Sequence, residues 1–165
     1  MVATLFKTKN ALPAKTRVDV IALLNQHLAD TTDLFTQVKT AHWNVEGPQF
    51  IALHELFDKL AEQLLEHTDL IAERGTALGG LAAGTVRQAA TSSRLKDLGS
   101  ATTDGLELVG SLVDRYAQLA AATREAIGRS TELEDADTAD LFTQVSRDLD
   151  MSLWFLEAHL QSRGR

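Results

Sequence analysis

The stretch PQFIALHELFDKLAEQLLEHTDLIAERGTA, residues 48–77, decides the fold of this chain. Its apolar side chains recur at steps of three and four residues, which predicts a long helix with one buried face. Pro48 is tolerated in the first turn of such a helix, and the pair Gly79-Gly80 ends it. The expected core stripe consists of Phe50, Leu53, Phe57, Leu60, Leu64 and Ile71.

Two pairs of metal-ligand side chains lie on this helix, beside the core stripe. His54 and Asp58 are four residues apart, and so are Asp69 and Glu73. Because residues four apart share a helix face, each pair presents two ligands together. All four fall within a stripe about 100° wide. Asp58 and Asp69 are nonetheless roughly 16 Å apart along a straight helix, so one chain cannot close both pairs around one metal ion.

Two antiparallel copies of the helix can close both pairs. The pairs share one midpoint, between Gln63 and Leu64, so a two-fold axis at that point places each pair opposite the other pair of its twin. A two-fold interface is self-complementary in this way. The sequence therefore predicts two metal sites per dimer, each formed between subunits.

Three further long helices are expected, at 17–44, 104–129 and 138–161. The segment 81–103 is a long crossover, expected to hold a short helix near 94–98, and the acidic segment 132–137 connects the last two helices. The expected buried set of the last helix is Leu141, Val145, Leu149, Leu153, Trp154, Leu156 and Leu160. Four long helices with a long crossover between the second and third predict an all-α, ferritin-like four-helix bundle.

Length and composition favour a single domain without disulfide cross-links. The chain has 165 residues and no cysteine, which excludes disulfides and thiolate metal sites. We expect a flexible basic arm at 1–16, the bundle at 17–162 and a short tail at 163–165. No apolar run is long enough for a membrane helix and no signal sequence is evident, so a cytoplasmic protein is expected. The net charge of −7 argues against DNA binding by the body of the protein.

A fifth ligand-type residue, His42, ends the first helix twelve residues before His54. A short break between the helices lets the two imidazoles converge, and with Asp58 they form the two-histidine, one-carboxylate set used for non-haem Fe(II). Such donors suit iron, manganese or zinc. A single His or Asp on a helix is usually structural or solvated, but five that fit one symmetric geometry favour a metal site. No Glu has a His three residues later, so a di-iron site in the bundle core is not expected.

Several stretches of the chain strongly resemble the Dps family, the DNA-binding proteins from starved cells, which are mini-ferritins. They are KTAHWNVEG at 39–47 with Phe50, Leu53-His54 and Phe57-Asp58; DLIAERGTALGG at 69–80; and, in the last helix, DTAD at 137–140, SRDLD at 146–150 and LWF at 153–155. The resemblance covers nearly the whole chain after residue 17, and its central motif is highly specific.

The resemblance implies a hollow dodecamer with ferroxidase sites at its two-fold interfaces. His42, His54 and Asp58 match the ligands from one subunit, and Asp69 and Glu73 match those from the two-fold mate. Proteins of this kind oxidise Fe(II), typically with hydrogen peroxide preferred over dioxygen, and store ferric oxide in the cavity, which protects DNA from hydroxyl radicals. Zinc and manganese are expected competitors for the sites.

Two further sets of residues match functional positions of the family but also have a purely structural explanation. Trp43 matches a tryptophan near the family's site that supplies an electron or contains radicals, although simple packing explains it equally well. Asp135, Asp137 and Asp140 are expected to line a three-fold pore for cation uptake, and Asp140 matches a pore-lining position of the family. Helix capping alone would explain one or two of these carboxylates.

The first seventeen residues hold four basic and no acidic side chains, namely Lys7, Lys9, Lys15 and Arg17. They form either a DNA-binding arm or an ordinary frayed terminus. The arm is shorter than the lysine-rich tail of the best-known family pattern, with Arg163 and Arg165 at the other end of the chain. We therefore expect weak, salt-sensitive, sequence-independent DNA binding, or none.

The first hypothesis is thus a ferroxidase that oxidises and stores iron. The alternative is a nucleoid-binding, compacting cage in which metal oxidation is weak or secondary, and a third hypothesis is a structural dimer with zinc in the site. The five ligands favour the first, and the small number of basic residues in the arm weakens the second. The expected partners are further copies of the chain, the oxidant and, weakly, DNA, with no membrane.

Overall fold

The computed structural model of the protein describes residues 5–99 and 102–161, which contain five helices. Their bounds are α1 Ala14–Asn44, α2 Phe50–Ala77, α3 Val86–Ser92, α4 Gly105–Glu132 and α5 Ala136–Ala158. Extended pairing in this part of the chain is limited to an isolated bridge between Glu46 and Asp104. The predicted all-α class is confirmed. Residues 1–4 of the expected arm and the expected tail at 163–165, with Arg163 and Arg165, lie outside the described residues.

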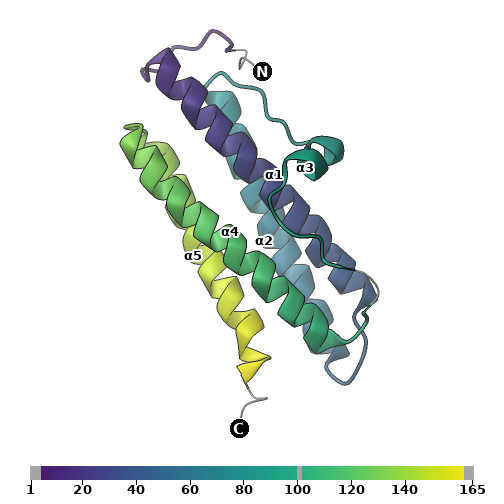
Figure 1. Ribbon diagram of the computed structural model, residues 1–165. Helices are drawn as coiled ribbons and strands as arrows, with labels where there is room; N and C mark the ends of the chain where they lie inside the picture. Colours follow the sequence, from purple (N-terminus) through teal and green to yellow (C-terminus); the bar gives the residue numbers. More distant parts are fainter. Residues whose placement is uncertain (1–4, 100–101, 162–165) are drawn as a thin grey trace.

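The long helices form two antiparallel pairs (Figure 1). α1 packs along α2, and α4 packs along α5. The crossover returns beside α1, so that α4 begins at the end of the bundle where α1 ends, and α3 lies against α1. Four long helices with one long crossover are the ferritin-like arrangement. No helix in the described part of the chain combines the length and apolarity needed to cross a membrane.

Two clusters of buried side chains hold the bundle together. One includes Phe57 and Tyr116, and the other includes Ile71 and Phe142. On α2, the predicted stripe members after Phe50 are at most 4% exposed. Fully burying one such aliphatic or aromatic side chain contributes roughly 1.5–3 kcal/mol, so the face predicted from the spacing is the one that binds α2 to its neighbours.

Some local predictions were wrong. The short helix of the crossover lies at 86–92, not near 94–98, because Thr85 and Gln88 form a capping box in which each side chain accepts the other residue's backbone N–H. Phe50 and Trp154 are 40% and 56% exposed rather than buried. Phe50 is the first residue of α2, whereas Trp154 lies about 140° around α5 from the buried Leu149 and so falls outside the buried face of that helix. α1 also begins at Ala14, three residues earlier than predicted.

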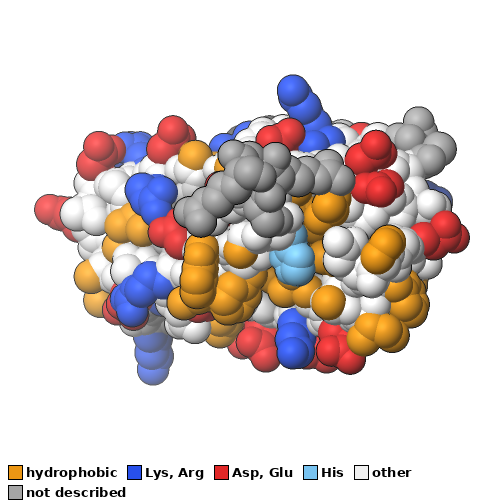
Figure 2. Space-filling view, turned by 90° about the horizontal axis from the view of Figure 1, so that it is seen from below, with side chains coloured by type: hydrophobic (Ala, Val, Ile, Leu, Met, Phe, Trp, Pro, Cys, Tyr) orange, Lys and Arg blue, Asp and Glu red, His pale blue; other side chains and the backbone are white. Residues whose placement is uncertain are grey.

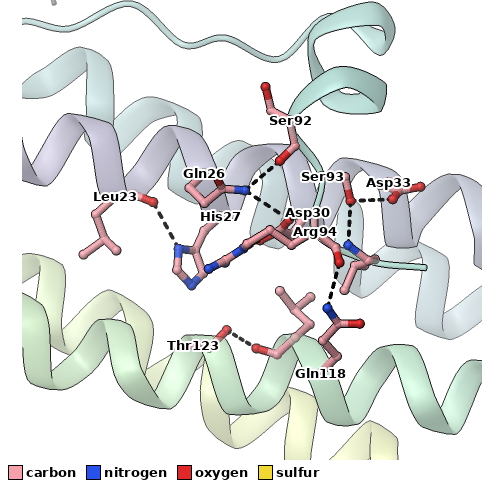
Figure 3. Close-up of polar contacts among 12 residues, drawn as sticks. Leu23, Gln26, His27, Asp30, Asp33, Ser92, Ser93, Arg94, Gln118 and Thr123 are labelled. Atoms are coloured by element: carbon pink, nitrogen blue, oxygen red, sulfur yellow. Dashed lines mark hydrogen bonds and ion pairs between the residues drawn. The ribbon is translucent and has the colours of Figure 1, made fainter. Parts of the chain in front are cut away.

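Two carboxylates of α1 hold the crossover against the bundle (Figure 3). The buried Asp30 accepts hydrogen bonds from Arg94 at 2.8 Å from the backbone N, 2.9 Å from Nε and 2.5 Å from Nη2. Asp33 accepts from the Ser93 hydroxyl at 2.5 Å, and Gln118 of α4 donates to the Arg94 carbonyl. A buried charge is tolerated when it is paired and fully hydrogen-bonded. These bonds fix 93–95 in a non-helical path, which local sequence patterns did not reveal.

His27 is buried one turn before Asp30 on α1. Its Nδ1 lies 3.0 Å from the Leu23 carbonyl oxygen (Figure 3), and its ring centroid is 4.7 Å from that of Phe142. Its Nε2 has no hydrogen-bond partner in the described part of the chain. Burial lowers the pKa of His27, an effect that the bond to Leu23 partly opposes and the Arg94 guanidinium reinforces.

The bundle should lose stability as the pH falls below about 6.5, the ordinary pKa of histidine. The unfolded chain then takes up a proton at His27 that the folded chain does not, so the free energy of unfolding falls by up to about 1.4 kcal/mol per pH unit for this group. In His27→Gln this contribution disappears, and urea unfolding at pH ~7.5 and ~5.5 should show a smaller decline than in the wild type. Equal declines in the two proteins would contradict the prediction.

Candidate metal centre

Two histidines meet where α1 ends and α2 begins. His42 Nδ1 lies 2.9 Å from the His54 carbonyl oxygen, and His54 Nδ1 lies 3.0 Å from the His42 carbonyl oxygen. The rings stack with their centroids 3.8 Å apart. Because a carbonyl oxygen only accepts, each Nδ1 carries the proton and donates it. In the neutral form of each ring, Nε2 then has a lone pair that can bind a metal ion, as is usual for metal-binding histidines.

The short connection between the helices brings these rings together. Val45 continues the last turn of α1 by donating to the Ala41 carbonyl, and Gly47 then adopts a φ of +105°. This left-handed region is open to glycine without strain. The Gly47 carbonyl accepts from Phe50 N at 3.0 Å, at the start of α2. A break of five residues thus lets His42 and His54 converge, as their spacing led us to expect.

Asp58 lies beside the rings and is held by a lysine of α1. Lys39 Nζ is 2.8 Å from Asp58 Oδ1, and His42 Nε2 is 3.9 Å from the same oxygen. The hydrogen bond from Lys39 lowers the pKa of Asp58, so the half-exposed carboxylate stays ionised at neutral pH. A metal ion bound by Asp58 and the two histidines would compete with this ammonium group.

The other two predicted ligands, Asp69 and Glu73, lie further along α2 with exposed side chains. Over residues 5–99 and 102–161, no group of three His, Asp or Glu side chains in one chain is arranged to hold a metal ion. The structure thus gathers His42, His54 and Asp58 near one another and leaves the second pair apart from them. One chain holds only part of the predicted site, and the intersubunit set stays a prediction.

Trp43 projects from the end of α1 next to His42 and is 69% exposed. Its ring centroid lies 6.0 Å from Lys39 Nζ. This distance is at the outer limit of a cation–π contact. Packing inside its own subunit therefore does not explain Trp43.

The three aspartates at the start of α5 have different surroundings. Asp135 is buried, accepts from Arg74 Nη2 at 2.7 Å and from the Thr138 hydroxyl at 2.6 Å, and caps the helix through Thr138 N. Its oxygens thus serve the capping role that was the alternative to a pore. Asp137 lies 3.6 Å from Arg74 Nη1. Asp137 and Asp140 are exposed and remain candidates for a pore lining.

The basic residues near the N-terminus also differ from one another. Lys15 pairs with Asp19 at 2.9 Å, and Arg17 donates to the carbonyls of Leu12 and Leu78. Lys7 and Lys9 are exposed. The non-helical segment that carries them lies against the bundle near the end of α2, where Phe6 N donates a hydrogen bond to the Gly79 carbonyl at 2.8 Å.

Two residues at these sites were not singled out from the sequence. Lys39 lies one helical turn before His42 and Trp43, which places all three on one face of α1 and is a signal that could have been used. Arg74, next to Glu73, reaches α5 through Asp135. That contact joins residues far apart in the chain, so no local pattern indicates it.

The chain is similar to known proteins over almost its whole length. A sequence model of the ferritin-like domain family matches residues 21–163. The DNA protection during starvation protein of Agrobacterium fabrum is 46% identical over 158 residues, covering 96% of this chain and 98% of the relative. A protein of the same description from Mycolicibacterium smegmatis is 35% identical, covering 93% and 83%. DpsA14 from Streptomyces coelicolor, a solved structure, superposes with a TM-score of 0.92 at 32% identity, covering 97% and 95%.

Removing the ammonium beside Asp58 should strengthen cation binding. In Lys39→Met we expect Zn²⁺, used as a redox-inert probe, to bind the oligomer several-fold more tightly, because the cation no longer competes with a positive charge for the carboxylate. Calorimetric titration measures the change. Lys59→Met is the matched control, because it removes an exposed lysine of α2 that is adjacent to Asp58 in sequence. If Lys39→Met bound Zn²⁺ no more tightly than the wild type, Lys39 would not compete with the cation for the Asp58 carboxylate.

Proposed function

Since this chain belongs to the Dps family of ferritin-like proteins, whose general roles are iron storage and DNA protection, we propose that it oxidises Fe(II) at sites shared by two copies of the chain. His42, His54 and Asp58 of one copy and Asp69 and Glu73 of the other are the proposed ligands. Hydrogen peroxide is the proposed preferred oxidant, and the ferric product is stored inside a cage.

The observation that carries this proposal is the reciprocal pairing of His42 and His54. Each ring is oriented by the other residue's backbone, and each keeps its Nε2 lone pair for a metal ion. A structural histidine needs no such arrangement, whereas metal-binding histidines commonly donate their second N–H to a carbonyl or a carboxylate. Asp58, within 3.9 Å of His42 Nε2, adds the carboxylate of the set.

The proposed ligands also favour the oxidation of Fe(II) to Fe(III). Carboxylates stabilise Fe(III) more than Fe(II), because the harder and more highly charged ion gains more from anionic oxygen. Three carboxylates and two imidazoles per site therefore favour the loss of an electron from bound Fe(II). Two Fe(II) ions each lose one electron to one hydrogen peroxide, whose O–O bond breaks, and two protons complete its reduction to two water molecules, so that no hydroxyl radical is released. Zinc or manganese would compete for the same donors.

Storage requires an enclosed volume, and we propose that twelve chains of 18.0 kDa form a hollow particle of about 216 kDa. Exposed hydrophobic side chains offer contacts for assembly. Figure 2 shows several groups of them, between charged side chains, on the end of the bundle at which α5 ends. The exposed carboxylates of Asp137 and Asp140 would draw Fe(II) towards the cavity at a three-fold axis, with Asp135 fixing the helix start beside them.

DNA compaction is the second candidate function, and the exposed Lys7 and Lys9 are the observation that favours it. Lys15 and Arg17 are engaged within the chain. Few phosphate contacts per chain make weak binding that salt abolishes, although many arms on one particle would act together. We therefore propose DNA binding as secondary to iron oxidation.

Oxidation should depend on the proposed ligands. Protein loaded anaerobically with Fe(II) and then mixed with hydrogen peroxide should form ferric product rapidly, as followed by absorbance. His54→Ala/Asp58→Ala should lower the rate on the order of 100-fold, because two of five ligands are lost. A sizing run confirms that the variant remains assembled. If the assembled variant oxidised Fe(II) as fast as the wild type, the proposed site would not be catalytic. A structural or DNA-compacting function would then be favoured over iron oxidation.

Co-assembly of two inactive variants tests whether the site is shared. His54→Ala/Asp58→Ala lacks one half of each site, and Asp69→Asn/Glu73→Gln lacks the other half. Random mixing in one oligomer restores about a quarter of the sites, each between two different variants, so about that share of the wild-type rate should return. Mixtures that stay as inactive as either variant alone would exclude a site formed between subunits.

DNA binding should be lost between ~50 mM and ~200 mM salt, because it depends on few phosphate contacts. In gel-shift titrations at low salt, Lys7→Ala/Lys9→Ala should bind less DNA than the wild type, whereas Lys59→Ala on α2 should not. Tight wild-type binding at ~200 mM salt, or no effect of the arm substitutions, would contradict a weak, arm-mediated interaction.

A further inference from the structure

We infer that the crossover is held to the bundle by a latch that opens in acid, when a proton taken up by His27 displaces Arg94 from Asp30. The latch contains one buried carboxylate that can pair with either of two cations. One is a guanidinium that is always charged, and the other is an imidazole that is charged only in acid. This conformational device is independent of the proposed metal site and uses none of its ligands.

Asp30 of α1 has one charged partner among the described residues, Arg94 of the crossover. The carboxylate is buried, and Arg94 donates to it from the backbone N and from two nitrogens of the guanidinium. Its remaining hydrogen bond comes from the Gln26 amide and is long, at 3.3 Å. The Arg94 side chain is 44% exposed, so the guanidinium can move into water without crossing the core, whereas the carboxylate cannot.

His27 lies one helical turn before Asp30, and the Arg94 side chain reaches from Asp30 toward its ring (Figure 3). Nδ1 of the ring donates to the Leu23 carbonyl at 3.0 Å, because a carbonyl oxygen only accepts. Nε2 is therefore the atom that can take up a proton. This atom is buried and has no hydrogen-bond partner in the described part of the chain.

The helices packed against His27 bring uncharged groups to its ring. α4 presents the Ala122 carbonyl, and α5 presents the Phe142 ring, whose centroid is 4.7 Å from that of His27. Among the described residues, the charges that act on the imidazole are those of Asp30 on α1 and Arg94 on the crossover. The protonation of His27 is therefore coupled to this one ion pair.

The net charge of the closed latch depends on pH. At neutral pH the latch holds one carboxylate and one guanidinium, whose charges cancel. A proton on His27 adds a second cation to the same buried region, and a buried charge without a partner is costly. Release of Arg94 into water restores neutrality, because Asp30 lies one turn from His27 on the same helix and can pair with the imidazolium.

The environment of His27 agrees with this direction. Burial is the largest cause that lowers the pKa of His27; the bond to Leu23 opposes it, and the charge of Arg94 lowers this pKa more than that of Asp30 raises it. The closed latch thus disfavours the proton, and by linkage the proton disfavours the closed latch. Below a pH of about 6.5, the ordinary pKa of histidine, each further pH unit should favour the open form by up to about tenfold.

The segment that the latch holds, residues 93–98, is not helical. Side chains of α1 and α4 bind its carbonyls instead, among them Gln37 and Gln118. Leu95 and Leu98 are partly buried at the margin of a core cluster. Opening a segment of this kind costs less free energy than unfolding the bundle, so the crossover should detach in acid while the four long helices remain folded.

Hydrogen exchange of the full-length protein, measured by mass spectrometry and corrected for the intrinsic exchange rate, reads the latch directly. The Arg94 amide donates to Asp30 Oδ1 at 2.8 Å. The Ala83 amide is the matched control, because it lies in the same crossover and donates at 2.8 Å to the uncharged side chain of Asn25. From pH ~6.5 to ~5.5, protection of the Arg94 amide should fall by up to about tenfold and that of Ala83 should not. Equal losses at both amides, or no loss at Arg94, would overturn the inference.

Variants assign the effect to the latch. His27→Gln is uncharged at every pH, so the protection of residues 93–98 should no longer depend on pH in this range. His159→Gln, which removes a histidine at the end of α5, should keep the wild-type dependence. Arg94→Gln removes the permanent cation, and the segment should exchange rapidly at both pH values. Wild-type pH dependence in His27→Gln or Arg94→Gln, with circular dichroism showing folded helices, would overturn the inference.

Discussion

The length and straightness of α2 impose the constraint on which the functional architecture depends. The helix carries His54 and Asp58 in one half and Asp69 and Glu73 in the other, on one face, roughly 16 Å apart along its axis. No change of side-chain conformation bridges that distance within one chain. Under the proposed assignment, chemistry that uses both pairs needs a second copy, and the surface that joins the two subunits is also the surface that would bind iron.

The rest of the bundle prepares one half of that surface in advance. The connection at Gly47 folds α1 back onto α2, and the reciprocal bonds of His42 and His54 orient both rings before any metal ion arrives. Lys39 meanwhile keeps the Asp58 carboxylate ionised and paired. Such preorganisation lowers the entropic cost of assembling the site when metal and partner bind.

The sequence predicted the features that local periodicity controls. The buried face of α2 and the four long helices follow from apolar spacing, and the position of His42 and His54 at a short break explains why their rings meet. The path of the crossover could not be predicted, because it depends on the long-range pairing of Asp30 with Arg94. Trp154 was wrongly expected in the core, because it lies about 140° around α5 from the buried Leu149 and therefore outside the core face that the spacing defines. The role of Asp135, like the path of the crossover, depends on a distant residue, Arg74.

The shared site is tested most directly by anomalous diffraction at the iron edge, from crystals of the oligomer soaked anaerobically with Fe(II). Iron should lie at two symmetry-related positions for every two-fold pair of subunits, next to the Nε2 atoms of His42 and His54 of one subunit and the carboxylates of Asp69 and Glu73 of the other. Iron held by a single subunit, or bound away from these side chains, would contradict a metal centre built from two copies of the chain.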